Sequence, residues 1–380
     1  MTGTAEPYDA VVIGAGIIGA SCGAALAAAG RRPLLIERAD VASGTTRAGM
    51  GHVVVTGGSP EISRLCRHSQ ELWRERAAGA WKDRVAIRPV GTLWLARGPE
   101  EQAQVEPLAE RLRANGARAE LLDRSGILAR EPAIGPRVTS GVFAPDDLVV
   151  DAVSATHHLV DEVTRLGGAL RTSTEVRRLV PEGVELADGS IVRSPTVIVA
   201  GGVESVRLLP ELGLRPRKGH LVHLATPPGF VRSQLAEVGY ARSAADDAAV
   251  VVSFNVQPPA SGGLYLGASR QYHAEDRGIE PRIVRALYER ARDFLPGLDG
   301  WPVLRTWTGW RPASPDHRPF IGPHPHRPGV WVAAGHEGLG ITSSLGTGRL
   351  IADLITGRTP ATPAEPFALD GRIGTPTEAA

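Results

Sequence analysis

The strongest constraint on the fold is the sequence GAGIIG at residues 14–19. The apolar run from Tyr8 to Ile13 precedes it, is rich in β-branched residues and predicts a buried strand. The Ala-rich stretch 20–29 follows it and predicts a helix. A second apolar run, 31–36, predicts another strand, which ends directly before the acidic residue Glu37. The order strand, glycine turn, helix, strand and acid predicts a dinucleotide-binding unit.

Each part of this motif has a physical reason. Gly14 allows a tight turn, Gly16 lets a pyrophosphate approach the backbone, and Gly19 lets the helix pack closely on the strand. The N–H groups and the positive dipole at the helix start are suited to hold phosphates. Glu37 is expected to accept hydrogen bonds from an adenosine ribose. The predicted pyrophosphate contacts are Gly14, Ala15, Gly16, Ile17, Ile18 and Gly19.

The loop after Glu37 is expected to make a second cofactor contact. Residues 39–52 are mostly small or carry hydroxyl groups, and Ser43, Thr45 and Thr46 can donate hydrogen bonds to a phosphate. Without the preceding strand–helix–strand unit, an ordinary Ser/Gly loop would be the better interpretation.

Composition restricts the remaining possibilities. A length of 380 residues favours two domains, or one large domain with an insertion. With 42 basic and 41 acidic residues the net charge is +1, which gives no indication of nucleic-acid or anionic-membrane binding. Two cysteines do not make a disulfide framework. Since no signal or transmembrane run is visible, a cytoplasmic location is expected.

The later parts of the chain predict two kinds of sheet. Buried apolar runs at 196–200 and 329–334 predict strands that return to the first, parallel sheet. The middle third predicts an antiparallel sheet with strands at 218–224, 249–255, 263–268 and 303–307, beside a helix at 281–294.

Five segments in this order resemble the D-amino-acid oxidase-like family of FAD enzymes. That family includes glycine oxidase, sarcosine oxidases and the flavin subunits of D-hydroxyproline, proline and opine dehydrogenases. The resemblance covers nearly the whole chain. It is carried by GAGIIG with Glu37, SGTTRAGMG at 43–51, VIVAGG at 197–202, GWRP at 309–312 with Asp316, Pro319, Ile321 and Gly322, and AGHEGLGI at 334–341.

The resemblance implies an α/β fold in which a discontinuous, Rossmann-like FAD-binding domain carries an inserted substrate domain of α+β type with an antiparallel sheet. The FAD-binding domain is predicted to comprise 1–84, 138–215 and 311–370. The substrate domain is predicted to comprise 85–137 and 216–310, and 371–380 is predicted to be a tail.

The resemblance also implies which residues hold FAD. Arg38 is expected near the adenine, and Val176, two residues after Thr174, is expected to meet it through its backbone. A helix starting at Gly340 would direct its positive end at the flavin. The further expected contacts are Ser43, Thr45, Thr46, Gly49, Met50, Gly51, Ala200, Gly201, His336, Glu337, Gly338, Leu339, Gly340, Ile341 and Thr342. Cys22 and Cys66 both occur early, unlike the flavin-tethering cysteine of sarcosine oxidases, so the FAD is expected to be noncovalent.

Arg311 matches the family arginine that binds the substrate carboxylate. His52 is the second candidate catalytic residue, and a hydrogen-bonded loop histidine is an equally good interpretation of it. Glycine oxidase carries a second arginine where this chain has Gly338, so Arg311 would act alone. Tyr240, Tyr265 and Tyr272 are all candidates for the family's substrate tyrosine, and His220 is interpreted as structural.

The function implied is oxidation of the C–N bond of an amino acid or secondary amine, such as a D-amino acid, glycine, sarcosine or a D-proline, by hydride transfer to flavin N5. No metal site is visible. Lys82 and Lys218 are the only lysines and neither falls in a flavin loop, which favours a dehydrogenase that passes electrons to a carrier protein or partner subunit. The alternatives are a flavin monooxygenase and a non-catalytic FAD-binding subunit.

Overall fold

The protein divides into two compact units in a computed structural model that describes residues 8–374, apart from 57, 241–249, 273 and 275. Unit 1 consists of residues 1–47, 152–215 and 311–380, and unit 2 of residues 48–151 and 216–310. Residues 375–380 of the predicted tail lie outside the described part of the chain.

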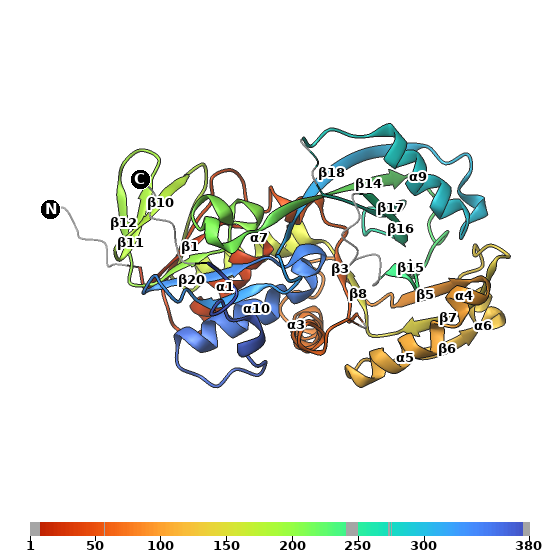
Figure 1. Cartoon of the computed structure of the whole chain (residues 1–380), viewed down its shortest axis with the longest axis horizontal. Coiled ribbons are helices and arrows are strands. Elements are labelled where there is room, and N and C mark those ends of the chain that lie inside the picture. Colours follow the sequence, from red (N-terminus) through yellow and green to blue (C-terminus); the bar gives the residue numbers. More distant parts are fainter. Residues whose placement is uncertain (1–7, 57, 241–249, 273, 275, 375–380) are drawn as a thin grey trace. The chain divides into compact units, whose positions relative to one another are not determined.

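Unit 1 is built on a six-stranded sheet in the order β19-β20-β13-β1-β2-β9 (Figure 1). Its strands are parallel except β19, which pairs antiparallel with β20 at one edge. This confirms the predicted return of two later strands to the N-terminal sheet. The bounds are β1 (Ala10–Ile13), β2 (Pro33–Ile36), β9 (Ala169–Arg171), β13 (Val197–Val199), β19 (Phe320–Pro323) and β20 (Val330–Ala334).

Helices cover one face of this sheet and a small sheet covers the other. Successive side chains of a strand point to opposite faces, so Val11 and Ile13 join a core with Val184 and Leu186 of the small sheet. The small sheet is antiparallel and consists of β10 (Val176–Val180), β11 (Gly183–Leu186) and β12 (Ile191–Arg193). On the helical face, α1 (Ile17–Ala28) packs against both α7 (Ala152–Arg165) and α10 (Gly340–Ile355) (Figure 1).

Unit 2 is built on an eight-stranded sheet in the order β18-β14-β17-β16-β15-β5-β7-β6. The predicted antiparallel sheet is confirmed with one exception, since β15 and β5 run parallel. The bounds are β5 (Thr92–Arg97), β6 (Glu120–Asp123), β7 (Val138–Ala144), β14 (Arg215–Leu224), β15 (Gln234–Glu237), β16 (Val250–Gln257), β17 (Leu264–Gln271) and β18 (Val303–Ala313).

The two faces of this sheet pack against different helices. Phe254 and Val256 of β16 lie in a core with Leu287 of α9 (Pro281–Arg292), which Figure 1 shows beside β16 and β17. Trp94 of β5 lies in a second core with Leu108 of α5 (Val105–Ala114) on the opposite face. The remaining elements are α2 (Thr45–Ala48), β3 (His52–Val53), α3 (Pro60–Ala78), β4 (Ile87–Arg88), α4 (Gly98–Gln102), α6 (Arg124–Arg130) and β8 (Leu148–Val150).

The division into units differs from the predicted boundaries. The first segment of unit 1 ends at Arg47 rather than at residue 84, and the second begins at Ala152 rather than at 138. The reason is long-range pairing, because β3 and β4 both pair with β8 in a separate three-stranded sheet. Gln70 of α3 also donates a 2.8 Å hydrogen bond to Asp147. The predicted segment 216–310 coincides with the second part of unit 2.

Close packing of α1 on α10 predicts the effect of one substitution. A Cβ at Gly348 would lie 2.4 Å from the carbonyl oxygen of Ser21. Helix propensity alone would make Gly348→Ala about 1 kcal/mol more stable, but the overlap with backbone should reverse the sign and cost about 1–3 kcal/mol. Urea unfolding measures the difference. Gly44→Ala, where a Cβ meets open space, should change stability by no more than about 0.5 kcal/mol; a stabilised Gly348→Ala variant would contradict the packing.

Candidate active site

The turn between β1 and α1 requires the glycines that the sequence placed there. Gly14 has a φ of +104°, and a Cβ on it would lie 2.7 Å from the carbonyl oxygen of Ala200. A Cβ on Gly19 would lie 1.9 Å from the carbonyl oxygen of Gly14. Neither contact is possible for a larger residue without a backbone shift, so the tight turn and the close approach of α1 depend on these two residues.

The N-terminus of α1 has the properties of an anion site. The helix begins at Ile17 after Gly16, which offers no side-chain cap, and its first turn has no acidic residue. The Ile17 N–H donates a 3.0 Å hydrogen bond to Oγ1 of Thr46, which brings one predicted cofactor residue to the helix start. N–H groups and the positive end of the dipole at such a terminus favour a phosphate. The residues present therefore fit the diphosphate of a dinucleotide.

Glu37 lies directly after β2 and faces this turn. Its Oε2 accepts a 2.9 Å hydrogen bond from the Ala15 N–H, and its Oε1 accepts a 3.0 Å bond from the Ala39 N–H. Because a carboxylate offers about four acceptor sites, capacity for ribose hydroxyls remains. Arg38, which is expected near the adenine, has Nη1 3.2 Å from Oε2 of Glu204.

Other predicted cofactor residues in unit 1 also follow the carboxyl ends of its parallel strands. The Thr174 N–H donates to the Glu37 carbonyl at 2.9 Å, which places the segment leading into Val176 beside the end of β2. Ala200, whose N–H donates to the Ile13 carbonyl, follows β13 with Gly201. Ligands of open parallel sheets bind at this edge.

His336 follows β20 at the same edge, but its ring points into the protein. It is 6% exposed, and Nε2 lies 3.0 Å from Oγ1 of Thr347 on α10. Burial lowers the pKa of His336 to about 3, so the ring is neutral at ordinary pH. The ring therefore tethers α10, and any cofactor contact from this position would come from the backbone.

The helix expected from Gly340 begins there, after a single 3-10 turn at Glu337–Leu339. Leu339 offers no side-chain cap, and the first turn of α10 has no acidic residue. As at α1, an uncapped N-terminus without acids favours an electron-rich group such as a carbonyl oxygen or an anion.

Arg311 is half-buried near the end of β18 and lies in unit 1. A Cβ on Gly338 would be 3.8 Å from its Cδ and 3.9 Å from its Nε, so the arginine passes directly beside this glycine. Ala313, two residues later, forms an isolated bridge with His336. Arg311 is thus held against the segment from which α10 begins.

The predicted cofactor loop 43–51 is divided between the two units. Its last residues, 48–51, belong to unit 2 and are held there by hydrogen bonds. Trp307 Nε1 donates a 3.2 Å hydrogen bond to the Ala48 carbonyl, and Gln257 Nε2 donates to the Met50 carbonyl. The Gly51 carbonyl accepts a 2.8 Å bond from the Val150 N–H. Gly49 lies between Ala48 and Met50 in the chain. His52, the other candidate catalytic residue, is half-buried in β3.

The three candidate tyrosines have different surroundings within unit 2. Tyr240 packs on Trp94, with ring centroids 6.4 Å apart, and beneath the Arg270 guanidinium. Tyr272 packs beneath Arg217. The ring centroids of Tyr265 and Trp307 are 5.4 Å apart, and Trp307 is the residue that donates a hydrogen bond to the Ala48 carbonyl.

His220 and Lys218 both have polar partners within unit 2. His220 bonds Oγ of Ser269 at 3.2 Å through Nδ1 and accepts the Glu280 N–H at 3.0 Å through Nε2, so both ring nitrogens are engaged within unit 2, as a structural role would require. Lys218 is buried, with Nζ 3.4 Å from carboxylate oxygens of Asp276 and Glu280.

Both cysteines are fully buried, and burial raises the pKa of Cys22 and of Cys66 to about 12. Neutral, buried thiols are poor nucleophiles, in agreement with a noncovalent FAD. Among the described residues no cluster of His, Cys, Asp and Glu could hold a metal ion. No helix within the described ranges is long and apolar enough to cross a membrane.

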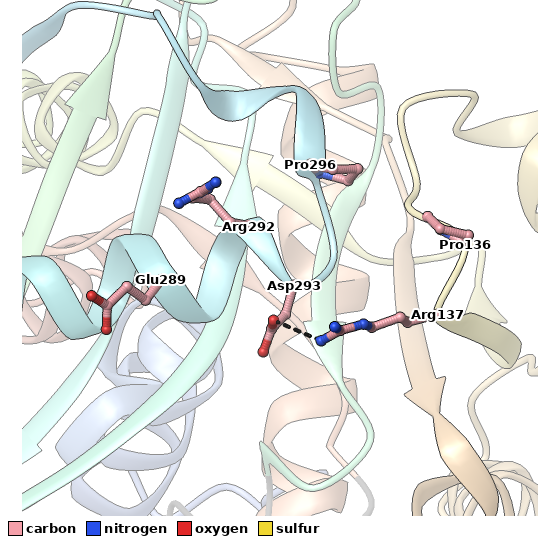
Figure 2. A pocket seen from close by; sticks show the side chains of 6 residues that line it. All are labelled: Pro136, Arg137, Glu289, Arg292, Asp293 and Pro296. Carbon is pink, nitrogen blue, oxygen red and sulfur yellow. Dashed lines mark hydrogen bonds and ion pairs between the residues drawn. The ribbon is translucent and has the colours of Figure 1, made fainter.

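A pocket of about 420 Å³ lies on unit 2, and none of the residues predicted to bind cofactor or substrate lines it. Figure 2 shows that charged side chains line it, including Arg137 and Asp293, which are 3.4 Å apart. Asp293 also pairs with Arg97 at 2.7 Å. Arg137 and Asp293 are therefore engaged with each other or with Arg97, and because no predicted site residue lines the pocket, we do not identify it as the active site.

The buried amides of Asn255 and Gln257 in β16 were not among the residues predicted from the sequence. Asn255 and Gln257 are 2% and 0% exposed, on the face opposite the α9 core. The alternation Phe254, Asn255, Val256, Gln257 would have revealed them, because polar residues on one face of an otherwise apolar strand indicate a second, polar environment.

The neutral His336 predicts a pH dependence of stability. Its folded pKa of about 3 lies below the usual value of 6.5, so its contribution is complete above pH 6.5 and is lost as the pH falls toward 3. His336→Asn, which cannot titrate, should show a smaller loss of the urea midpoint between pH 7.5 and pH 5 than the wild type. Equal losses would show that the imidazole does not titrate as its burial requires.

Comparison with known proteins agrees with this geometry. The family model described as FAD dependent oxidoreductase matches residues 9–354. A D-amino acid dehydrogenase of Xanthobacter autotrophicus is 31% identical over 318 residues, covering 79% of this chain and 70% of that protein. A protein of Rhizobium meliloti that is named as one subunit of an opine oxidase is 26% identical over 354 residues, covering 88% and 90%.

The crystal structure of glycine oxidase from Geobacillus kaustophilus has a TM-score of 0.85 and 26% identity to this chain. The match covers 97% of this chain and 100% of that one, so the fold is shared throughout. Together with the match over residues 9–354, this shows that the chain belongs to the family of FAD-dependent oxidoreductases.

Proposed function

We propose that this FAD-dependent oxidoreductase oxidises the carbon–nitrogen bond of an amino acid or secondary amine. The observation that carries the proposal is the placement of Arg311 beside Gly338, at the segment from which α10 begins. A half-buried guanidinium there can bind a carboxylate through two parallel hydrogen bonds. The relatives named D-amino acid dehydrogenase and glycine oxidase support a substrate that carries both a carboxylate and an amine.

The residues of unit 1 fit the cofactor that this reaction needs. We propose that the diphosphate lies at the N-terminus of α1, with the ribose on Glu37 and the flavin pyrimidine edge at the N-terminus of α10. FAD, when bound, supplies a hydride acceptor for the carbon next to the amine nitrogen. The uncapped end of α10 favours the negative charge that accumulates on this edge during reduction.

Arg311 contributes by position. By fixing the substrate carboxylate it restricts rotation of the amino acid, so that one C–H bond keeps a reactive orientation. The amine is bound neutral, because a nitrogen lone pair is needed as the hydride leaves. The product imine hydrolyses to an oxo acid, or stays cyclic when the substrate is a proline.

We further propose a dehydrogenase whose electrons pass to a carrier protein or partner subunit. Lys218 is occupied by Asp276 and Glu280, and Lys82, the only other lysine, is exposed. Neither lysine belongs to the sequence segments proposed to hold flavin, where a lysine could promote a rapid reaction with oxygen. The relative that is named as one part of an opine oxidase supports a partner.

The substrate is tested by mixing the purified yellow protein anaerobically with D- and L-amino acids, prolines and N-methylglycine. At least one of these compounds should bleach the protein, because hydride transfer reduces the flavin and removes the absorption band of its oxidised form. Admitting air afterwards should restore the colour slowly, whereas an artificial electron acceptor should restore it quickly. Absence of bleaching by every amine, with rapid reduction by NADPH instead, would favour a flavin monooxygenase.

Arg311→Leu should raise KM for the bleaching amino acid about tenfold or more, since a charge-assisted pair to the carboxylate is lost. The same variant should leave reduction by the corresponding amine without a carboxylate unchanged. Arg165→Leu, an exposed arginine at the end of α7, is the matched control and should behave like the wild type. Equal effects of Arg311→Leu on both substrates would mean that this guanidinium does not bind the carboxylate.

The cofactor site is tested by Gly19→Ala. The added Cβ would lie 1.9 Å from the Gly14 carbonyl oxygen and should displace the turn that holds the diphosphate. Purified variant should carry less than about a tenth of the wild-type flavin, judged by the ratio of absorbance at 450 nm to that at 280 nm. Full flavin content in a correctly folded variant would place the diphosphate elsewhere.

A further inference from the structure

The strand β16 carries two buried amides, Asn255 and Gln257, on one face. Phe254 and Val256 enter the core that includes α9. Asn255 and Gln257 alternate with them and therefore point to the opposite face of the sheet. Asn255 pairs with Ala236, which lies in the core of that opposite face.

Met50 lies close to this part of the sheet. Asn255 pairs with Gly267, and a Cβ on Gly267 would lie 3.1 Å from Sδ of Met50. Gln257 Nε2 donates to the Met50 carbonyl. Met50 is one of the residues expected to contact the cofactor, so the amides lie beside the segment proposed to meet the flavin. All of these residues belong to unit 2.

Both amide oxygens lack a partner among the described residues. Oδ1 of Asn255 and Oε1 of Gln257 are buried, and neither accepts a hydrogen bond. The amide nitrogen of Gln257 is committed to Met50, which leaves its oxygen as the unused group. Oε1 of Gln234 on the adjacent strand β15 is likewise buried without a partner. Buried acceptors are normally satisfied, so their accumulation on one face points to a ligand with hydrogen-bond donors.

We propose that the amide oxygens of Asn255 and Gln257 accept the two N–H bonds of a primary amine, and so determine which amines the enzyme oxidises. The proposal rests on the proposed function, because it assigns the amine-binding side of that reaction. The residues lie two positions apart on one strand, about 7 Å between Cα atoms. Two side chains at that spacing can both reach one nitrogen placed over the strand.

The chemistry of the face selects for donors and against oxygen anions. Amide oxygens repel a carboxylate, so this face does not duplicate the role proposed for Arg311. A neutral primary amine offers two N–H donors and keeps its lone pair free for the reaction. An N-methyl group would replace one donor and leave one buried oxygen unsatisfied, which selects against it. The substrate class is therefore a primary amino acid rather than an N-alkylated one.

The test compares three ligands that differ only at nitrogen: D-alanine, N-methyl-D-alanine and propionate. Binding to the FAD-loaded protein is measured by anaerobic titration calorimetry, so that a ligand which binds without reducing flavin is still detected. The wild type should bind D-alanine at least about tenfold more tightly than its N-methyl derivative. Glycine and acetate serve as the second matched pair if alanine is too large.

Asn255→Leu removes the amide but keeps a side chain with the same branching and the same number of heavy atoms. It should weaken D-alanine binding about tenfold or more, leave propionate binding within twofold of wild type, and leave the melting temperature unchanged or raised. Asn255→Asp, which keeps an acceptor oxygen at the same place, should retain D-alanine binding within a few fold. Ser21→Ala, which removes a buried unpartnered hydroxyl from α1, is the control and should change neither ligand's affinity.

Two outcomes would overturn the inference in a folded Asn255→Leu variant: unchanged D-alanine and glycine affinity, or equal weakening of amine and des-amino acid. The first would mean that only water meets these oxygens. Either result leaves the proposed function standing as long as an amine bleaches the wild-type flavin. Conversely, if these amino acids bind the wild type with the predicted selectivity and bleach nothing, the amine site is correct and the proposed oxidation is wrong.

Discussion

The structure depends on the close approach of helix α1 to strand β1. Two glycines make it possible, because a Cβ on Gly19 would overlap the carbonyl oxygen of Gly14 and one on Gly14 would overlap that of Ala200. The approach brings the start of α1, whose first turn carries no acidic residue, to the carboxyl edge of the parallel sheet. Segments that follow the other strands of the sheet meet the same edge, so one packing constraint assembles a site from distant parts of the chain.

Two polar residues near this edge have different roles: His336 is structural, whereas Arg311 is proposed to bind substrate. His336 is neutral and lies within hydrogen-bond distance of Thr347, so its ring tethers α10, while Leu339 makes no side-chain cap at the start of that helix. Arg311, in contrast, is half-buried, and its Cδ and Nε pass beside Gly338. Unit 2 has a comparable division within its own sheet: the Gln257 nitrogen donates to the Met50 carbonyl, whereas its oxygen has no partner among the described residues.

Local sequence signals predicted the parts of the fold that depend on neighbours in the chain. The first strand–turn–helix unit, Glu37 at the end of β2 and the start of α10 at Gly340 follow from glycines, apolar runs and one acid within short windows. The unit boundary at Arg47 could not be predicted in this way, because it results from the pairing of β3 with β8 about a hundred residues later. The same holds for the inward ring of His336, whose partner lies on the following helix.

A crystal structure of the protein with FAD and propionate tests the central claim most directly. The account predicts that the diphosphate lies at the N-terminus of α1 against Gly14 and Gly16, and that the propionate carboxylate lies on Arg311. A diphosphate bound away from α1, or a carboxylate that contacts the amides of Asn255 and Gln257 instead of Arg311, would contradict it.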